Sequence, residues 1–236
     1  MPQSDPGGSM VPVERRAPSS GKIQGMVRVK ICGITRHEDA KLAVELGAHA
    51  LGLNFYPQSP RSLTPFQAAE LIRRMPPFVV WVGVFVNWDG VAIVALAKAL
   101  RLAVAQLHGE ESAQVVERVS RHLPVIKALR LSPGTEAADF ARYRSASSFL
   151  LDTAVSGHYG GTGRTGNWHL ARPAAQSHRI ILAGGLTPEC VGEAIRIVRP
   201  FAVDVASGVE SRPGKKDPGK LRAFFDEVAR ANRELA

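Results

Sequence analysis

Two side chains suited to proton transfer stand where apolar runs of the sequence end. Cys32 follows the run VRVKI, and Asp152 closes the run SFLLD. A thiolate can accept a proton, and a carboxyl group that emerges from an apolar wall can keep a raised pKa and donate one. Each has a structural alternative, because free cysteines are often small buried hydrophobes and aspartates often form turns. The pair predicts acid–base chemistry if the fold brings both residues to one opening.

Other polar residues also lie at or near the ends of apolar runs. Arg61, in the loop YPQSPRSLT, can bind a planar carboxylate through two parallel hydrogen bonds, and an ordinary solvated loop arginine is the alternative. Gln106 and His108 end and follow the run LAVAQL, and Asp204 lies in FAVDVA. We take all four as substrate-binding candidates, with a structural histidine equally open at position 108. Lys127 is either a site residue or a charge in the barrel interior that is paired with a carboxylate.

Two glycine-bearing turns follow the last two apolar runs. Gly184 and Gly185 precede a segment that begins Thr-Pro, and Ser207 and Gly208 follow FAVDVA. Glycines let backbone N–H groups approach an anion closely, and a helix N-terminus adds a favourable dipole. Either turn alone would indicate only a tight bend. Two of them in succession predict a phosphate-binding site.

These residues depend on a regular alternation of apolar and amphipathic segments. We expect strands at 27–31, 50–55, 78–86, 102–107, 124–129, 148–152, 179–184 and 201–206. We expect helices at 38–47, 64–75, 89–101, 110–122, 134–144, 167–175, 187–198 and 217–232. Eight strand–helix pairs predict an α/β protein with a single (β/α)8 TIM barrel, in which chemistry takes place at the C-terminal ends of the strands. The absence of a GxGxxG segment after the first strand disfavours an open dinucleotide-binding sheet.

Local signals mark several helix ends. Thr35 and Glu38 have the spacing of a capping box, and Gly47 is expected to end the helix that follows. The Thr-Pro pairs at 64–65 and 187–188 are typical helix starts. Pro173 is expected to limit the helix near 167–175.

Composition narrows the class of protein. The chain has 236 residues and a net charge of +9, with Lys and Arg scattered rather than clustered and few aromatic residues. This pattern disfavours nucleic acid and suits electrostatic steering of a small anionic substrate. No run approaches the roughly 18 apolar residues of a membrane span. We expect a cytoplasmic protein, because the two cysteines form no disulfide framework, and we expect no metal and no cofactor.

The chain divides into two parts by composition. Residues 1–25 are rich in Pro, Gly and Ser and lack apolar periodicity, so we expect a disordered N-terminal extension. Residues 26–236 are expected to form the barrel, as a monomer or a homodimer.

A series of short segments carries a family resemblance. KICGIT, GLNFYPQSPR, VGVFVN, QLHG, LLDT, GGTGRT, LAGGL and VDVASGVE occur in this order over about residues 26–232. Together they resemble the phosphoribosylanthranilate isomerases of tryptophan biosynthesis. The resemblance implies a cofactor-free barrel that converts N-(5-phosphoribosyl)anthranilate into 1-(2-carboxyphenylamino)-1-deoxyribulose 5-phosphate, an Amadori rearrangement.

The resemblance also implies residue roles. Cys32 would be the general base, Asp152 the general acid and Arg61 the ligand of the anthranilate carboxylate. The phosphate would bind at the glycines of GGL and the Ser-Gly of VDVASG, which are Gly184, Gly185, Ser207 and Gly208. Asp204 is a candidate for orienting sugar hydroxyls or the substrate nitrogen.

The chain departs from the family at one segment, and three rival interpretations stay open. Gly166-Asn167-Trp168 replaces the usual Phe-Asp-Trp, which puts closure of the loop at 156–166 in doubt. The histidine-pathway isomerase performs the same rearrangement, but that family carries an aspartate on its first strand where this chain has Cys32. A catalytically silent barrel that binds nucleic acid and a generic phosphosugar-binding module are the other two rivals.

Overall fold

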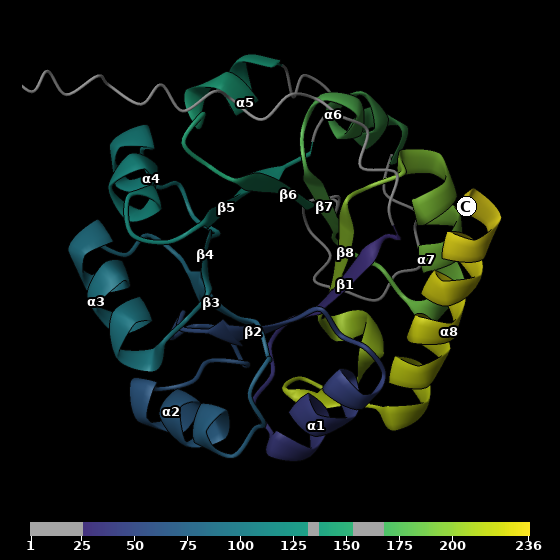
Figure 1. Ribbon diagram of the computed structural model, residues 1–236, viewed down its shortest axis with the longest axis horizontal. Helices are drawn as coiled ribbons and strands as arrows, with labels where there is room; N and C mark the ends of the chain where they lie inside the picture. The colour runs from purple at the N-terminus through teal and green to yellow at the C-terminus, as the bar shows by residue number, and fades with distance from the viewer. Residues whose placement is uncertain (1–25, 132–136, 153–167) are drawn as a thin grey trace, which may run out of the picture.

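The computed structural model describes residues 26–131, 137–152 and 168–236. Figure 1 looks down a closed barrel of parallel strands with helices arranged around it, which confirms the predicted (β/α)8 fold. The barrel strands are β1 (Arg28–Ile31), β2 (Ala50–Asn54), β3 (Trp81–Phe85), β4 (Val104–Leu107), β5 (Val125–Arg130), β6 (Ser148–Asp152), β7 (Ile180–Ala183) and β8 (Ala202–Val205). The expected extension at 1–25 and the loop at 156–166 lie outside the described residues.

Helices cover the outside of the barrel. They are α1 (His37–Glu45), α2 (Pro65–Arg73), α3 (Gly90–Leu100), α4 (Ala113–Ser120), α5 (Ala137–Arg142), α6 (Ala171–Ser177), α7 (Pro188–Val198) and α8 (Pro218–Leu235). Two short 3-10 helices, η1 (Trp168–Leu170) and η2 (Ser207–Val209), precede α6 and follow β8. No described helix has the length and apolar character that crossing a membrane requires.

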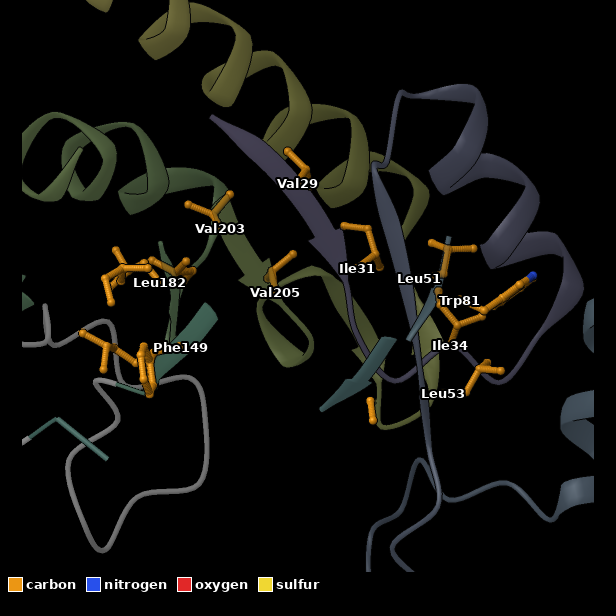
Figure 2. Packing of buried hydrophobic residues seen from close by; sticks show 14 of the residues in the cluster. Val29, Ile31, Ile34, Leu51, Leu53, Trp81, Phe149, Leu182, Val203 and Val205 are labelled. Carbon is orange, nitrogen blue, oxygen red and sulfur yellow. The ribbon is translucent and has the colours of Figure 1, made fainter. Parts of the chain in front are cut away.

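Side-chain alternation along the strands separates two apolar layers. Val82, Ile126 and Leu150 point into the barrel and form a small inner cluster. Their neighbours along the strands, such as Leu51 and Leu151, are fully buried between strands and helices, in the larger cluster that Figure 2 shows in part. The polar site residues on the strands therefore have to come from the inward-facing positions near the strand ends.

The expected strand at 78–86 is shorter in the structure. Phe78 has a φ of 73° and is fully exposed, so the chain enters β3 only at Trp81.

The capping box expected at Thr35 and Glu38 is wrong. Helix α1 begins after Arg36, which makes no side-chain cap, while the hydroxyl of Thr35 donates instead to the carbonyl oxygen of Gly214. Gly47 does follow the end of α1 with a φ of 93°, as predicted. A tertiary partner far along the chain thus outcompeted the local cap.

The limit expected at Pro173 is also wrong. This residue occupies the first turn of α6, where a missing backbone N–H leaves no helical hydrogen bond unmade, and α6 continues to Ser177. Gly166 and Asn167, which depart from the family pattern, lie outside the described residues.

A small antiparallel hairpin was not predicted. Strands β9 (Glu210–Arg212) and β10 (Lys215–Lys216) pair between η2 and α8. Short polar strands of this kind lack the apolar alternation on which sequence prediction depends. The hairpin carries residues that matter for the site.

Candidate active site

The first group of site residues lies where β1 and β8 run side by side. The ammonium of Lys30 contacts the carboxylate of Asp204 at 2.9 Å, and the two side chains are only 4% and 7% exposed. Cys32 directly follows β1, and its backbone N–H donates to the carbonyl oxygen of Val205 at 2.8 Å. Gly52 on the neighbouring strand leaves room for this group, because a Cβ there would lie 2.9 Å from the sulfur of Cys32 and 3.2 Å from the Nζ of Lys30.

The electrostatics of this group couple the thiol to the lysine. Burial raises the pKa of Cys32, and the charge of Asp204 raises it further, while Lys30 and Lys216 oppose both effects without reversing them. Burial lowers the pKa of Lys30, but Asp204 and Cys32 outweigh burial and the net pKa is raised. Burial thus favours the thiol over the thiolate, and the ion pair of Lys30 and Asp204 lies beside the sulfur.

The second group lies on β4 and β6. The amide nitrogen of Gln106 and Nδ1 of His108 are 2.8 Å apart, and Nε2 of His108 lies 3.9 Å from a carboxylate oxygen of Asp152. If the amide donates to Nδ1, the proton of the neutral ring is on Nε2 and points toward Asp152. Asp152 and His108 are each about one-third exposed, at 36% and 35%, so the carboxyl group can meet a ligand.

A buried ion pair holds the turn that carries His108. The carboxylate of Glu111 accepts hydrogen bonds from the backbone N–H groups of Gly109 and Asn87, both at 3.0 Å. Nζ of Lys127 lies 2.8 Å from that carboxylate and donates to the carbonyl oxygen of Gly109 at 2.6 Å. The ion pair therefore holds the backbone on both sides of His108, at Leu107 and Gly109, and joins it to the backbone of Asn87.

This network corrects the interpretation of Lys127. Its carboxylate partner was expected, but it lies on the face of β5 opposite Ile126 and Ala128, so it is not inside the barrel. No local pattern identified Glu111 as the partner, since acidic residues are common near the start of a helix.

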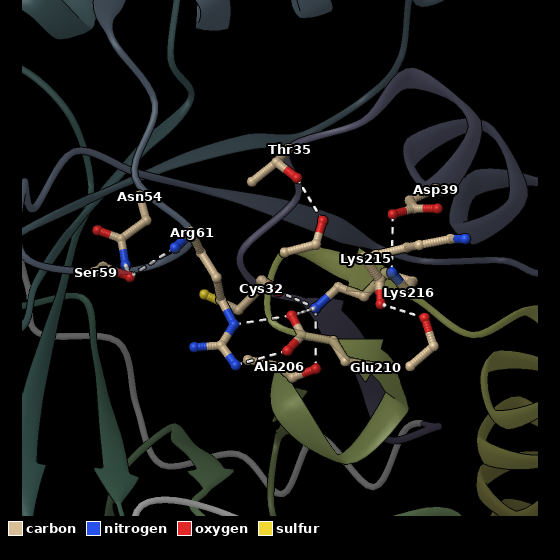
Figure 3. Close-up of polar contacts among 12 residues, drawn as sticks. Cys32, Thr35, Asp39, Asn54, Ser59, Arg61, Ala206, Glu210, Lys215 and Lys216 are labelled. Atoms are coloured by element: carbon tan, nitrogen blue, oxygen red, sulfur yellow. Dashed lines mark hydrogen bonds and ion pairs between the residues drawn. The ribbon is translucent and has the colours of Figure 1, made fainter.

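Arg61 reaches the site across Gly33. A Cβ at Gly33 would collide with the Cδ of Arg61, so only glycine allows the arginine to cross here. The guanidinium contacts Glu210 through two hydrogen bonds, and Figure 3 shows this pair beside Cys32 and Lys216. Arg61 is thus no ordinary solvated loop arginine, although its partner was missed at the sequence level.

The two glycine-bearing turns meet, as the phosphate-site prediction requires. Gly184 and Gly185 have φ angles of 87° and 69°, which favour glycine. A Cβ on Gly208 would overlap the carbonyl oxygen of Leu186, so the turn after β8 packs directly on the turn after β7. Ser207 begins η2 at this junction. Within the described part of the chain, no group of three or more His, Cys, Asp or Glu residues is placed to hold a metal ion.

Fold and site together define a (β/α)8-barrel protein with its polar groups at the C-terminal ends of the strands. The family model for N-(5'phosphoribosyl)anthranilate (PRA) isomerase matches residues 29–227. The chain therefore belongs to the phosphoribosylanthranilate isomerase family, which confirms the resemblance.

Individual relatives agree with this assignment. The N-(5'-phosphoribosyl)anthranilate isomerase of Pelobacter propionicus is 52% identical over 200 residues, which are 85% of this chain and 94% of the relative. The crystal structure of the Thermotoga maritima phosphoribosyl anthranilate isomerase has a TM-score of 0.81 and 44% identity, covering 86% of this chain and 99% of that one. A further isomerase structure contains reduced 1-(o-carboxyphenylamino)-1-deoxyribulose 5-phosphate; it has a TM-score of 0.77 and 42% identity, with 86% and 99% of the two chains covered.

Proposed function

We propose that this chain converts N-(5-phosphoribosyl)anthranilate into 1-(2-carboxyphenylamino)-1-deoxyribulose 5-phosphate by acid–base catalysis, with Asp152 as acid and Cys32 as base. One observation carries the proposal: both residues take inward positions at the same end of the barrel. Cys32 lies on the side of Lys30, and Asp152 shares the face of the inward-pointing Leu150. Family membership supplies the reaction, and this placement supplies the two groups that it needs.

The first step opens the sugar ring. Asp152 in its protonated form donates to the ring oxygen, the bond from this oxygen to C1 breaks, and the nitrogen lone pair forms the C=N bond of an iminium. The carboxylate that remains lies 3.9 Å from Nε2 of His108. His108 and Gln106 are proposed to orient Asp152 through the chain of contacts described above.

The second step removes the proton from C2. The thiolate of Cys32 accepts this proton, and the electron pair of the C–H bond neutralises the iminium to give an enolamine, which tautomerises to the ketone. The thiol has to ionise first, and Lys30 is placed to stabilise the thiolate. Asp204 holds Lys30 in place and is also proposed to orient the sugar hydroxyls or the substrate nitrogen.

Substrate binding is assigned to both sides of this pair. Arg61 is proposed to bind the anthranilate carboxylate. Ser207 and the three glycines of the two touching turns are proposed to bind the phosphate through backbone N–H groups. The ligand is therefore a small phosphorylated molecule, and the oligomeric state, monomer or homodimer, stays a prediction.

The deciding experiment follows the fluorescence of phosphoribosylanthranilate with the purified protein. We expect the signal to decay at a rate proportional to protein concentration, and we expect this decay to be abolished in the Cys32 and Asp152 variants. Unchanged fluorescence with the wild-type protein would exclude the proposed activity.

A further inference from the structure

The ion pair between Arg61 and Glu210 uses only part of the guanidinium. Nε of Arg61 donates to one carboxylate oxygen of Glu210 at 2.8 Å, and Nη2 donates to the other at 2.6 Å. In this side-on arrangement, Glu210 does not use the edge of the guanidinium that is formed by Nη1 and the second hydrogen of Nη2. A planar carboxylate fits that edge with two parallel hydrogen bonds, as it fits any arginine end-on. Arg61 can therefore hold a substrate carboxylate without releasing Glu210.

Glu210 is itself fixed from the other side. Nζ of Lys216 contacts the carboxylate of Glu210 at 3.0 Å, and the two side chains are 1% and 4% exposed. The same ammonium donates to the carbonyl oxygens of Cys32 at 2.7 Å and Ala206 at 2.9 Å. As Figure 3 shows, the anchor of Arg61 is thus tied to the backbone of the proposed base and to the end of β8.

The charges of this group favour an anionic ligand. Two cations, Arg61 and Lys216, share the single carboxylate of Glu210, which leaves one excess positive charge. Burial raises the pKa of Glu210, but Arg61 and Lys216 lower it more, so the carboxylate stays ionised. A ligand can reach this positive charge at Arg61, whose side chain is 20% exposed, but not at Lys216, which is fully buried. A carboxylate at the open edge of Arg61 would neutralise it.

We infer that Glu210 is a positioning residue that orients Arg61 toward the carboxylate of the anthranilate ring, with Lys216 holding Glu210. This inference rests on the proposed function and gives the site its preference for an ortho-carboxylated aromatic amine. Glu210 does not touch the reacting atoms, so it acts on binding rather than on the chemical step.

The test compares two ligands on matched variants. One ligand is reduced 1-(o-carboxyphenylamino)-1-deoxyribulose 5-phosphate, and the other is the same compound with a phenyl ring in place of the carboxyphenyl ring. In Glu210→Gln we expect about a 10-fold loss of affinity for the first ligand and less than about a 2-fold change for the second, because one charged hydrogen-bonding contact is misaligned. KM for the natural substrate rises by a similar factor, while kcat changes little.

Three further variants sharpen the result. Arg61→Ala shows the same selective loss, and adding Glu210→Gln to it changes nothing more, because Glu210 acts through Arg61. Glu210→Asp keeps a negative charge beside Lys216, so we expect it to spare the fold better than Glu210→Gln, and we expect a partial selective loss because the shorter side chain aligns Arg61 less well. The control is Glu70→Gln, which breaks an Arg–Glu pair of similar geometry with Arg73 on the exposed face of α2 and alters neither affinity.

The possible failures are distinguishable. Equal weakening of both ligands in both Glu210 variants would show general damage and overturn the positioning role, as would no effect on either ligand. If the wild-type protein turns over phosphoribosylanthranilate but the Glu210 variants weaken both ligands equally, only this inference is overturned. A wild-type protein without turnover overturns the proposed function and this inference with it.

Discussion

Cys32 shows how closely a single residue depends on its neighbours. Its sulfur occupies space that Gly52 leaves open, with the Lys30–Asp204 pair beside it. Burial disfavours the thiolate, and Lys30 opposes this effect in part, so the pKa of Cys32 is raised less than burial alone would raise it. The structure thus gives this cysteine a polar environment, which a merely space-filling cysteine would not need.

The raised pKa of Cys32 predicts an alkaline pH dependence. Since the thiolate is the active form, kcat/KM should still be rising at and above the ordinary thiol range of about 8.5. Cys32→Ser should lower the rate by about 10²- to 10⁴-fold and remove this limb of the profile, because a hydroxyl does not ionise there. Steady-state rates at several pH values check both points. Cys190→Ser, at the other free cysteine, should keep the wild-type profile.

Asp152→Asn separates chemistry from binding. The amide cannot give a proton to the ring oxygen, so kcat should fall by about 10²- to 10⁴-fold. The shape and polarity of the side chain are preserved, so affinity for the reduced product analogue should stay within a few-fold. Asp226→Asn on the exposed face of α8 is the control. Near-normal turnover in Asp152→Asn would remove the assigned acid.

At the scale of single residues, the candidate site residues could be predicted from the sequence more easily than the residues that they contact. Cys32, Asp152 and the glycine turns could be recognised because each ends an apolar run. Glu210 could not be paired with Arg61, because the two are 149 positions apart and nothing local links them. The same holds for Lys216, whose strand is too short and too polar to be predicted.

At the scale of elements, buried ion pairs fix the turns that follow the strands. Glu111 and Lys127 hold the turn after β4, while Glu210 and Lys216 hold the ends of β1 and β8. Glu111, Lys127 and Lys216 also bond to backbone groups, whereas the carboxylate of Glu210 accepts from the side chain of Arg61. Such pairs bring little net stability but are costly to break from one side.

Glu111→Gln should therefore destabilise the protein at neutral pH. It leaves Lys127 buried without its counter-charge, which costs about 3–5 kcal/mol in the free energy of unfolding. Urea titrations at pH 7 measure this loss. Glu117→Gln, which breaks an exposed pair with Arg121 on α4, is the control and should cost less than about 1 kcal/mol.

The same variant should change the acid sensitivity. Burial raises the pKa of Glu111, but Lys127 and the backbone donors lower it more, so its folded pKa lies below the unfolded value. Its stabilising contribution is present above the unfolded pKa of about 4.3 and is lost as pH falls through the lower folded value. Wild-type and Glu111→Gln stabilities should converge at acid pH. Parallel curves would contradict this role for Glu111.

The order and type of the barrel elements could be read from the sequence, because each is a repeated pattern of buried and exposed residues. Thr64 and Gln67 formed a cap at one Thr-Pro start, whereas Thr35 formed none. The difference lies in Gly214, which a distant hairpin brings to Thr35. Local capping rules hold only where no such tertiary partner competes.

At the scale of the whole molecule, the barrel closes where its first and last elements meet. The side chain of Asn232 on α8 accepts from the backbone N–H of Val27 at 2.8 Å and donates to its carbonyl oxygen at 3.2 Å. Strand β1 pairs with β8 over its whole length. Closure thus depends on contacts between residues more than 170 positions apart, and the count of eight strands was the only sequence sign of it.

Asn232→Ala should weaken this closure. It leaves two part-buried backbone groups of Val27 without their partner, at a cost of about 1–3 kcal/mol in the free energy of unfolding. Fluorescence and circular dichroism should report one shared unfolding transition at a lower urea concentration. Separate unfolding transitions for the two probes would show that the barrel does not unfold as one unit, and would contradict a role of this contact in the stability of the whole barrel.

We also propose that residues 26–236 suffice for catalysis. The contacts that close the barrel begin at Val27, and the family match begins at residue 29. A chain that starts at Met26 should keep the melting temperature and the turnover of the full chain. A large loss of either would assign a role to residues 1–25.

The two hydrogen bonds between Asn232 and Val27 also make a circular permutation of the barrel geometrically feasible. Because the end of α8 lies against the start of β1, a short flexible bridge could join these two points without straining either element. New ends could then be cut into an exposed connection on the side away from the site. Such a circularly permuted barrel would keep every strand beside its present neighbours and the proposed acid and base at the same opening.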